Sequence, residues 1–286
     1  MKIRKVGVVG CGNMGSQYTQ SCAQAGYEVI ASEVSDSQLS KGLAAIESRL
    51  RADVEKGRLS LQDKASIMSR ITPTTDIEEF AECDIVVENV TEKMDLKKKV
   101  FADLDEVCPE HAVLAANTSG LSIIDMAMAT KKPDKVLGLH SGPLTAPFME
   151  IIKTVATSDE TLEIGKGFSK SLGMTFVIAP DIPGFVLNRL YFAFLLTAVR
   201  MVEAGITTPQ DIDTIFTKCF NHRVGPLTQL DIAGLDNSLD VASGIYEQLK
   251  DPLYAPPTLL RKMVAAGWLG CKTGKGFYEY SEVGKE

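Results

Sequence analysis

Histidine is scarce in this chain of 286 residues, which contains only His111, His140 and His222. Chemistry that needs an imidazole must therefore use one of these three side chains. The six cysteines are scattered singly and form no CxxC pair, so neither a zinc ribbon nor a disulfide scaffold is predicted. We expect no metal site, and cysteines that stay reduced in a cytoplasmic protein.

The sequence also lacks a basic excess and long apolar runs. Its 37 Asp and Glu outnumber its 30 Lys and Arg, leaving a formal net charge of −7, which argues against binding to duplex DNA. No stretch reaches the roughly 18 apolar residues that a membrane span needs. Residues 6–10 are too short a run for the core of a signal peptide. We expect a globular protein with no nucleic-acid or membrane partner.

Strands and helices alternate through the first part of the chain. Apolar, β-branched runs predict strands at 5–9, 29–31, 72–75, 84–89, 112–116, 136–140, 149–153 and 175–179. Helical periodicity predicts helices that end near residue 25 and span 78–83, 93–107 and 157–172. Residues 35–70 form a long, charged segment whose apolar residues recur with a helical period. This alternation predicts an α/β fold with a doubly wound, mostly parallel sheet.

The alternation stops near Pro180. Beyond it only helices are predicted, at 186–204, 208–218, 238–249 and 257–266. The sequence 181–184, which contains Pro183 and Gly184, is typical of a boundary. We therefore expect two domains, 1–182 with the α/β sheet and 183–286 with helices only.

A glycine-rich loop follows the first predicted strand. Gly10, Gly12 and Gly15 fit the spacing G-x-G-x-x-G, and Glu33 ends the next strand 18 positions past Gly15. This arrangement is typical of a Rossmann-type dinucleotide site, in which the pyrophosphate meets a helix N-terminus and the acid binds the adenosine ribose. A carboxylate repels a 2′-phosphate, so NAD is favoured over NADP. The alternative is a glycine turn that merely precedes a helix. The expected cofactor contacts here are Gly10, Gly12, Asn13, Met14, Gly15 and Glu33.

An enzyme that oxidises an alcohol with a nicotinamide needs a base for the hydroxyl proton, and imidazole is the usual group. His140 ends the strand 136–140, and doubly wound sheets bind ligands at the carboxyl ends of their strands. His111 lies in a polar turn and is interpreted as a surface residue. His222 lies in a turn between helices, where a structural or dimer-contact role is favoured. A histidine packed in the core remains the alternative for His140.

Four further polar residues are candidates near this base. Glu150 opens the next strand and could hold the imidazole in one tautomer. Ser119 and Asn117 follow the strand 112–116 and reach the same sheet edge, although such residues also favour turns. Asn188 lies in the first turn of the first C-terminal helix, where it would face the crevice between the domains. Its alternative is a capping or surface amide.

Together these residues resemble the L-3-hydroxyacyl-CoA dehydrogenase family, especially the bacterial 3-hydroxybutyryl-CoA dehydrogenases, over nearly the whole chain. The matching stretches are Val8–Gly15, Asn117–Ser119 with Leu121–Ile123, Pro183–Arg189, Gly225–Leu227 with Gly234–Asp236, and Gly267–Gly270 with Lys272–Tyr278. The last of these is the most specific.

The resemblance implies a role for each candidate. It makes His140 the general base, Glu150 its partner, and Ser119 and Asn188 the contacts to the reacting oxygen. It places Glu92, Lys97 and Asn117 among the cofactor-binding residues, the first two near the nicotinamide. It also implies that residues 37–70 form a helical hairpin that helps to bind coenzyme A, that the helical domain mediates a homodimer, and that the enzyme acts in fatty acid metabolism. Four cations of the hairpin could meet phosphates or simply face solvent: Arg49, Arg51, Lys56 and Arg58.

One segment departs from the family. After the catalytic histidine the family usually reads Phe-Phe-Asn-Pro, whereas this chain has Ser141-Gly-Pro-Leu-Thr-Ala-Pro up to residue 147, and the loop is two residues shorter. The main hypothesis is an NAD-dependent oxidoreductase that interconverts 3-hydroxyacyl and 3-oxoacyl thioesters. The altered loop motivates an alternative, a dehydrogenase for a more polar hydroxyacyl group on an acyl carrier protein. A catalytically silent nucleotide-binding dimer is the alternative from another class.

Overall fold

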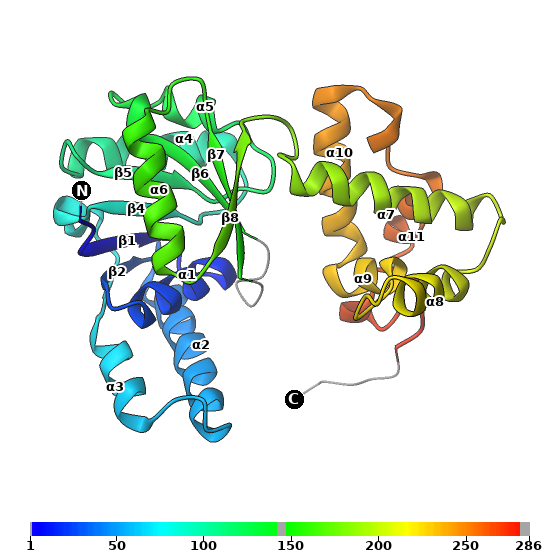
Figure 1. Ribbon diagram of the computed structural model, residues 1–286, viewed down its shortest axis with the longest axis horizontal. Helices are drawn as coiled ribbons and strands as arrows, with labels where there is room; N and C mark the ends of the chain where they lie inside the picture. Colours follow the sequence, from blue (N-terminus) through cyan, green and yellow to red (C-terminus); the bar gives the residue numbers. More distant parts are fainter. Residues whose placement is uncertain (1, 142–146, 281–286) are drawn as a thin grey trace. The chain divides into compact units, whose positions relative to one another are not determined.

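The computed structural model describes residues 2–141 and 147–280 (Figure 1). The chain divides into two compact units, Met1–Asp181 and Ile182–Glu286. This division falls one residue before the boundary expected from the sequence. In the described part of the chain, no helix is long and apolar enough to cross a membrane.

The first unit is built on one sheet whose strand order is β3-β2-β1-β4-β5-β6-β7-β8. Every pair of neighbouring strands is parallel except β6 and β7, which are antiparallel. The predicted doubly wound, mostly parallel sheet is therefore confirmed. Its strands are β1 (Lys5–Val9), β2 (Glu28–Ser32), β3 (Ile71–Thr74), β4 (Ile85–Glu88), β5 (Val113–Ala116), β6 (Val136–Ser141), β7 (Phe148–Lys153) and β8 (Thr175–Pro180).

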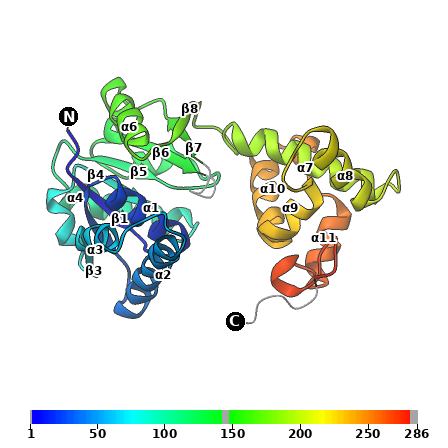
Figure 2. The same ribbon diagram turned by 60° about the horizontal axis from the view of Figure 1, so that its bottom comes forward.

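Helices cover both faces of this sheet, with α1 and α6 on one face and α4 and α5 on the other (Figures 1 and 2). Because helices bury the central strands on both faces, these strands are continuous apolar runs. The helices of the unit are α1 (Asn13–Gln24), α2 (Asp36–Glu55), α3 (Leu61–Ser69), α4 (Met94–Val107), α5 (Ile123–Ala127) and α6 (Asp159–Ser171). The sequence did not predict α5, which has only five residues and no room for a helical period.

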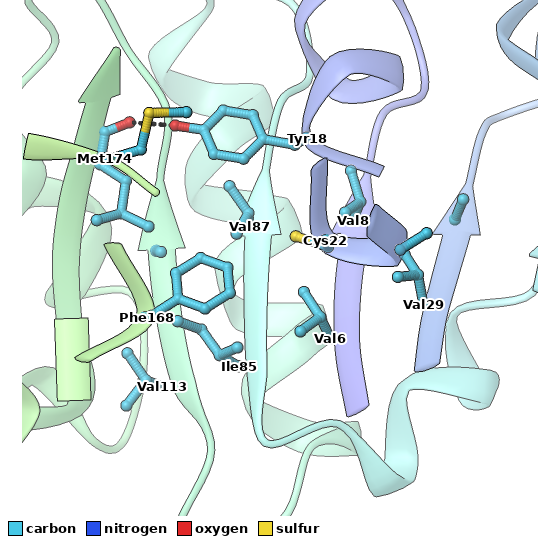
Figure 3. Close-up of a cluster of buried hydrophobic side chains, with 14 of the residues drawn as sticks. Val6, Val8, Tyr18, Cys22, Val29, Ile85, Val87, Val113, Phe168 and Met174 are labelled. Carbon is cyan, nitrogen blue, oxygen red and sulfur yellow. Dashed lines mark hydrogen bonds between the residues drawn. The ribbon is translucent and has the colours of Figure 1, made fainter. Parts of the chain in front are cut away.

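The core of the unit lies between the sheet and the helices α1 and α6. Figure 3 shows alternate apolar residues of β1 (Val6 and Val8) and β4 (Ile85 and Val87) pointing toward Tyr18 and Cys22 of α1 and Phe168 of α6. All of these side chains are completely removed from solvent. Burial of this apolar surface, at about 25 cal/mol per Å², is the main force that holds α1 and α6 against the sheet.

Two glycines allow α1 to begin close to the end of β1. Gly10 has a φ of +87°, which L side chains rarely adopt. A Cβ atom on Gly15 would lie 1.6 Å from the carbonyl oxygen of Gly10, so no side chain fits there. A Cβ on Gly12, by contrast, would have no neighbour within 4 Å, which leaves open space above the helix N-terminus.

The charged excursion at 37–70 folds as the two helices α2 and α3. Ser35 caps α2 by accepting a hydrogen bond from the Gln38 amide, and Ser60 with Asp63 forms a capping box at α3. A Cβ atom on Gly42 would lie 2.3 Å from the carbonyl oxygen of Cys11. The hairpin therefore packs directly on the glycine turn.

The second unit has its own core of helices. They are α7 (Leu187–Glu203), α8 (Pro209–Cys219), α9 (Pro226–Ala233), α10 (Leu235–Leu249) and α11 (Thr258–Ala265). Between residues 182 and 280 the only strand-like pairing consists of isolated bridges that involve Lys275, so the helical prediction is confirmed. The sequence missed α9, because this short helix is mostly apolar and shows little amphipathic period.

Buried carboxylates hold the C-terminal segment of this unit. Asp231 is fully buried, and its carboxylate accepts hydrogen bonds from the backbone amides of Phe277 (2.9 Å) and Tyr278 (3.0 Å). A Cβ on Gly276 would lie 2.0 Å from a carboxylate oxygen of Asp231. The close approach of the Asp231 carboxylate therefore requires a glycine at position 276, within the stretch Lys272–Tyr278.

We expect Gly15→Ala to lower the free energy of unfolding by about 3 kcal/mol or more, because the new methyl group would overlap backbone that cannot move aside. Urea titration measures this loss. The matched control is Gly167→Ala in α6, where a Cβ meets no atom within 4 Å and the helix should gain about 0.5–1 kcal/mol. Equal stabilities for the two variants would contradict the packing described for Gly15.

Candidate active site

The antiparallel pairing of β6 and β7 brings His140 and Glu150 together. They are directly opposite each other in the ladder, so their side chains leave the same face of the sheet. Nδ1 of His140 lies 2.6 Å from Oε2 of Glu150. Both residues are buried, with relative exposures of 6% and 0%. The structure thus places side by side two of the residues that the sequence predicts for the site.

This contact determines how the imidazole can act. A carboxylate only accepts hydrogen bonds, so Nδ1 carries the proton that it shares with Glu150. In the neutral ring Nε2 then carries the lone pair and is the nitrogen that can act as a base. The carboxylate also stabilises the imidazolium that results. The loop that departs from the family pattern follows directly; of it, residues 142–146 lie outside the described residues.

A second group of charges lies at the carboxyl ends of β4 and β5. Nζ of Lys97, in α4, donates to Oε1 (2.8 Å) and Oε2 (2.9 Å) of Glu88 and to the carbonyl oxygen of Asn117 (2.8 Å). Lys97 and Glu88 are both fully buried. Burial raises the pKa of Glu88, and the ammonium of Lys97 opposes that rise.

The same network orients the turn after β5. Oε1 of Glu92 accepts hydrogen bonds from the Ser119 amide (2.9 Å) and from the Thr118 hydroxyl. The side-chain amide of Asn117 donates to Oδ1 of Asn89 (2.7 Å). Four residues predicted from the sequence thus lie in one connected network: Glu92, Lys97, Asn117 and Ser119. This network is at the edge of the sheet where β6 presents His140.

Sequence reasoning missed three members of this network: Glu88, Asn89 and Thr118. A signal for Glu88 was available, since it is a lone acid that ends the apolar run 85–88, and a lysine follows nine residues later. No comparable signal pointed to Asn89 or Thr118, because short polar residues after a strand are ordinary turn residues.

Two hollows meet beside the glycine turn, and Glu33 lines both. One, of about 440 Å³, is also lined by Gly10, Gly12 and Asn89. The other, of about 310 Å³, lies between α1 and α2. Open space at Gly12, a helix N-terminus and a carboxylate at the end of β2 fit the phosphates and ribose of a dinucleotide.

Asn13 and Met14, the other two residues predicted to contact the cofactor, differ in whether they line these hollows. Asn13 is exposed at the start of α1 and lines the smaller hollow. Met14 is partly buried against the core of the first unit and lines neither of these two hollows. Its predicted contact with the cofactor therefore stays a prediction.

The remaining histidines are outside this group. Nε2 of His111 lies 3.1 Å from Oδ1 of Asp84 at the surface. His222 follows α8, and its ring centroid is 5.4 Å from that of Phe216. Asn188 lies in the first turn of α7, in the second unit, where it is buried. Of the three histidines, all of them described, His140 alone pairs with a fully buried carboxylate.

The cations of the hairpin take different roles. Arg49 binds α1, with Nε donating to Oε1 of Gln20 (2.7 Å) and Nη2 to Oγ of Ser16 (3.1 Å). Arg51 and Arg58 form exposed ion pairs with neighbouring acids of the hairpin. Arg49 therefore connects the hairpin to the helix that follows the glycine turn.

Comparison with known proteins gives a consistent answer over the full chain. Residues 5–182 match the family model for the 3-hydroxyacyl-CoA dehydrogenase NAD binding domain, and residues 184–280 match the model for the C-terminal domain of the same family. A probable 3-hydroxybutyryl-CoA dehydrogenase from Bacillus subtilis is 38% identical over 284 residues, 99% of each chain. A 3-hydroxybutyryl-CoA dehydrogenase from Mycobacterium tuberculosis is 39% identical over 282 residues, 97% of this chain and 99% of that one.

Solved structures agree with these sequence matches. The crystal structure of (S)-3-hydroxybutyryl-CoA dehydrogenase from Ralstonia eutropha superposes with a TM-score of 0.95 at 38% identity, covering 98% of this chain and 100% of that chain.

The buried ion pair gives a prediction for stability. Lys97→Met would leave the Glu88 carboxylate buried without its cation, so we expect the free energy of unfolding to fall by about 3–5 kcal/mol. The control is Lys99→Met, which removes an exposed pair with Asp103 in the same helix and should cost less than about 0.5 kcal/mol. Adding Glu88→Gln to Lys97→Met should restore part of the loss. Denaturant unfolding decides, and similar losses for Lys97→Met and Lys99→Met would refute the expectation.

Proposed function

Because the chain belongs to the 3-hydroxyacyl-CoA dehydrogenase family, and so is an NAD-dependent oxidoreductase that interconverts 3-hydroxyacyl-CoA and 3-oxoacyl-CoA, we propose that His140 is its general base. The observation that supports this role most strongly is the 2.6 Å contact between Nδ1 of His140 and the buried carboxylate of Glu150. It leaves Nε2 as the proton acceptor. Glu150 is the partner that fixes the tautomer.

The proposed reaction balances with these groups. Nε2 of His140 takes the proton of the 3-hydroxyl. The bond between C3 of the substrate and its hydrogen breaks as the carbonyl forms. The bound NAD supplies the hydride acceptor at C4 of its nicotinamide. Glu150 stabilises the imidazolium until the proton leaves. In the reverse direction the imidazolium returns its proton to the oxygen of the reduced 3-oxo group.

Ser119 and Asn188 are the proposed contacts of the reacting oxygen. The network around Glu92 holds the backbone of Ser119 in place after β5, at the same sheet edge as His140. Asn188 lies in residues 184–280, which match the C-terminal domain of the family. Hydrogen bonds from a hydroxyl and an amide would stabilise negative charge on that oxygen as it develops.

The proposed cofactor site uses the glycine turn and the network beneath it. Backbone amides at the start of α1, including those of Asn13 and Met14, would face the phosphates. Glu33 would accept hydrogen bonds from the adenosine ribose. Near the nicotinamide end, we assign the contacts to Glu92, Lys97 and Asn117, with Nζ of Lys97 bound to the Asn117 carbonyl and 3.5 Å from the Glu92 carboxylate.

We further propose a short acyl group, because the named relatives act on 3-hydroxybutyryl-CoA.

A homodimer is proposed on the large apolar side chains that the helical unit leaves exposed, among them Leu190, Ile206, Ile215 and Phe220. A cytoplasmic location is proposed on the cysteines: all six lie in the described part of the chain and are free thiols.

Acetoacetyl-CoA with NADH tests the reaction and the base together. We expect NADH oxidation by the native enzyme and a fall in kcat of about 10²–10⁴-fold for His140→Gln, because general base catalysis is worth about that much. NADH absorbance at 340 nm measures the rate, and NADH fluorescence checks that the variant still binds the cofactor.

His111→Gln is the matched control, since it removes an imidazole that contacts a surface carboxylate, and it should leave kcat unchanged. Full activity in His140→Gln would overturn the proposed base. If only a carrier-protein thioester were reduced and acetoacetyl-CoA were not, the proposed short acyl-CoA substrate would be wrong.

Glu33 gives a prediction for cofactor preference. Glu33→Gln removes the charge that repels a 2′-phosphate, and it weakens a charged hydrogen bond to the ribose. Each change should alter the affinity for the corresponding cofactor by on the order of tenfold. We therefore expect the ratio of kcat/KM for NADH over NADPH to fall by about tenfold or more. Glu28→Gln, at the exposed opposite end of β2, should leave the ratio unchanged. An unchanged ratio in Glu33→Gln would show that another group selects the cofactor.

A further inference from the structure

The phenol of Tyr18 contacts the strand segment that carries His140. Tyr18 is completely buried in α1, and its hydroxyl lies 3.1 Å from the carbonyl oxygen of Leu139 and 3.1 Å from Oγ of Ser141. Figure 3 shows this hydroxyl at the end of the core cluster, with its hydrogen bond drawn as a dashed line. The two partners are the residues on either side of His140.

The strand β6 needs a contact at this point. Its ladder with β5 ends at the pair Ala116–Gly138, so residues 139–141 extend beyond β5. On the other side β7 continues to pair with them, up to Ser141 and Met149. The ladder therefore supports the extension that carries His140 from one side only. Tyr18 adds a second point of attachment, from α1.

The hydrogen-bond directions follow from the chemistry. The phenol has one proton, which it donates to the Leu139 carbonyl. The Ser141 hydroxyl is then the donor to the phenol oxygen. Burial raises the pKa of Tyr18, so the phenol stays neutral and does not act as a proton donor in the reaction. Both hydroxyls thus stabilise position, while the chemistry belongs to His140.

Ser141 is the first residue of the segment that departs from the family, where a phenylalanine is usual. A phenylalanine has no hydroxyl to donate to Tyr18, so the contact depends on the departure itself. Side chains at 139 and 141 leave the sheet on the face of α1, whereas His140 leaves on the opposite face. Replacing the ring at 141 by serine therefore changes the support behind His140 rather than only the space around the substrate.

We propose that Tyr18, through Leu139 and Ser141, is a positioning residue for His140, an inference that rests on the proposed role of His140 as general base. The same helix starts at the glycine turn that is proposed to hold the dinucleotide phosphates. One rigid helix therefore connects the cofactor site to the strand end that carries the base. Correct placement of the base relative to the cofactor affects the chemical step, where small displacements are costly.

Tyr18→Phe tests this proposal, because it keeps the ring in the core and removes only the hydroxyl. We expect kcat for acetoacetyl-CoA reduction to fall about tenfold, while the Kd for NADH and the KM for acetoacetyl-CoA stay within twofold. Ser141→Ala removes one of the two partners and should give a smaller fall of the same kind. It also keeps the proposal testable if Tyr18→Phe folds poorly.

Thr157→Val is the matched control. The buried Thr157 hydroxyl donates to the carbonyl oxygen of Val136 (2.7 Å), at the far end of the same strand. It also accepts a hydrogen bond from the Thr154 amide (3.0 Å), so its removal should cost at least as much stability as Tyr18→Phe. We expect kcat to remain at the native value in Thr157→Val.

The outcomes separate this inference from the proposed function. Native kcat in Tyr18→Phe, or an equal fall of kcat in Thr157→Val, would overturn the positioning role while leaving His140 as the base. Full activity in His140→Gln would instead overturn the base itself. A fall of kcat in Tyr18→Phe accompanied by a parallel loss of NADH affinity would show that the hydroxyl supports the cofactor site and would also contradict the proposal.

Discussion

The antiparallel pairing of β7 with β6 is the constraint on which the candidate site depends. In an all-parallel sheet, the residue that faces the carboxyl end of one strand comes from the carboxyl end of its neighbour. Here the reversal puts Glu150, early in β7, directly opposite His140, near the end of β6. A register shift of one residue would send the carboxylate to the other face of the sheet. The two apolar residues that flank Glu150, Met149 and Ile151, are fully buried on the opposite face and fix that register.

The charged network at the carboxyl ends of β4 and β5 allows ionised side chains to be buried there. The carboxyl edge of a parallel sheet collects polar groups at strand ends, yet α4 and α5 cover that edge from one face. Lys97 and Glu88 are each costly to bury alone, and they are tolerated together because the ammonium meets three oxygen acceptors. The pair fixes the carbonyl oxygen of Asn117 and so the course of the turn that ends with Ser119.

Local pattern predicted most of the fold. The strands, the glycine turn and the position of Glu33 follow from short-range rules, since apolar runs, glycines and strand-end acids have the same meaning in any sheet of this class. Long-range partners were harder. The contact of His140 with Glu150 was expected because Glu150 opens the next strand only ten residues later and because the family resemblance implied it. That of Tyr18 with Ser141 spans 123 positions. A tyrosine in an amphipathic helix looks like an ordinary core residue until the strand beside it is known.

The close packing of the hairpin on the glycine turn has a consequence for protein engineering. Gly42 has no side chain because the carbonyl oxygen of Cys11 occupies the space, and Arg49 ties the same helix to Ser16 and Gln20. A bulkier residue at Cys11 would push α2 outward, and a side chain at Gly42 would displace the turn in return. Attempts to retarget this scaffold to a new nucleotide or a new thioester must therefore vary both segments in one library, since neither can be optimised while the other is held constant.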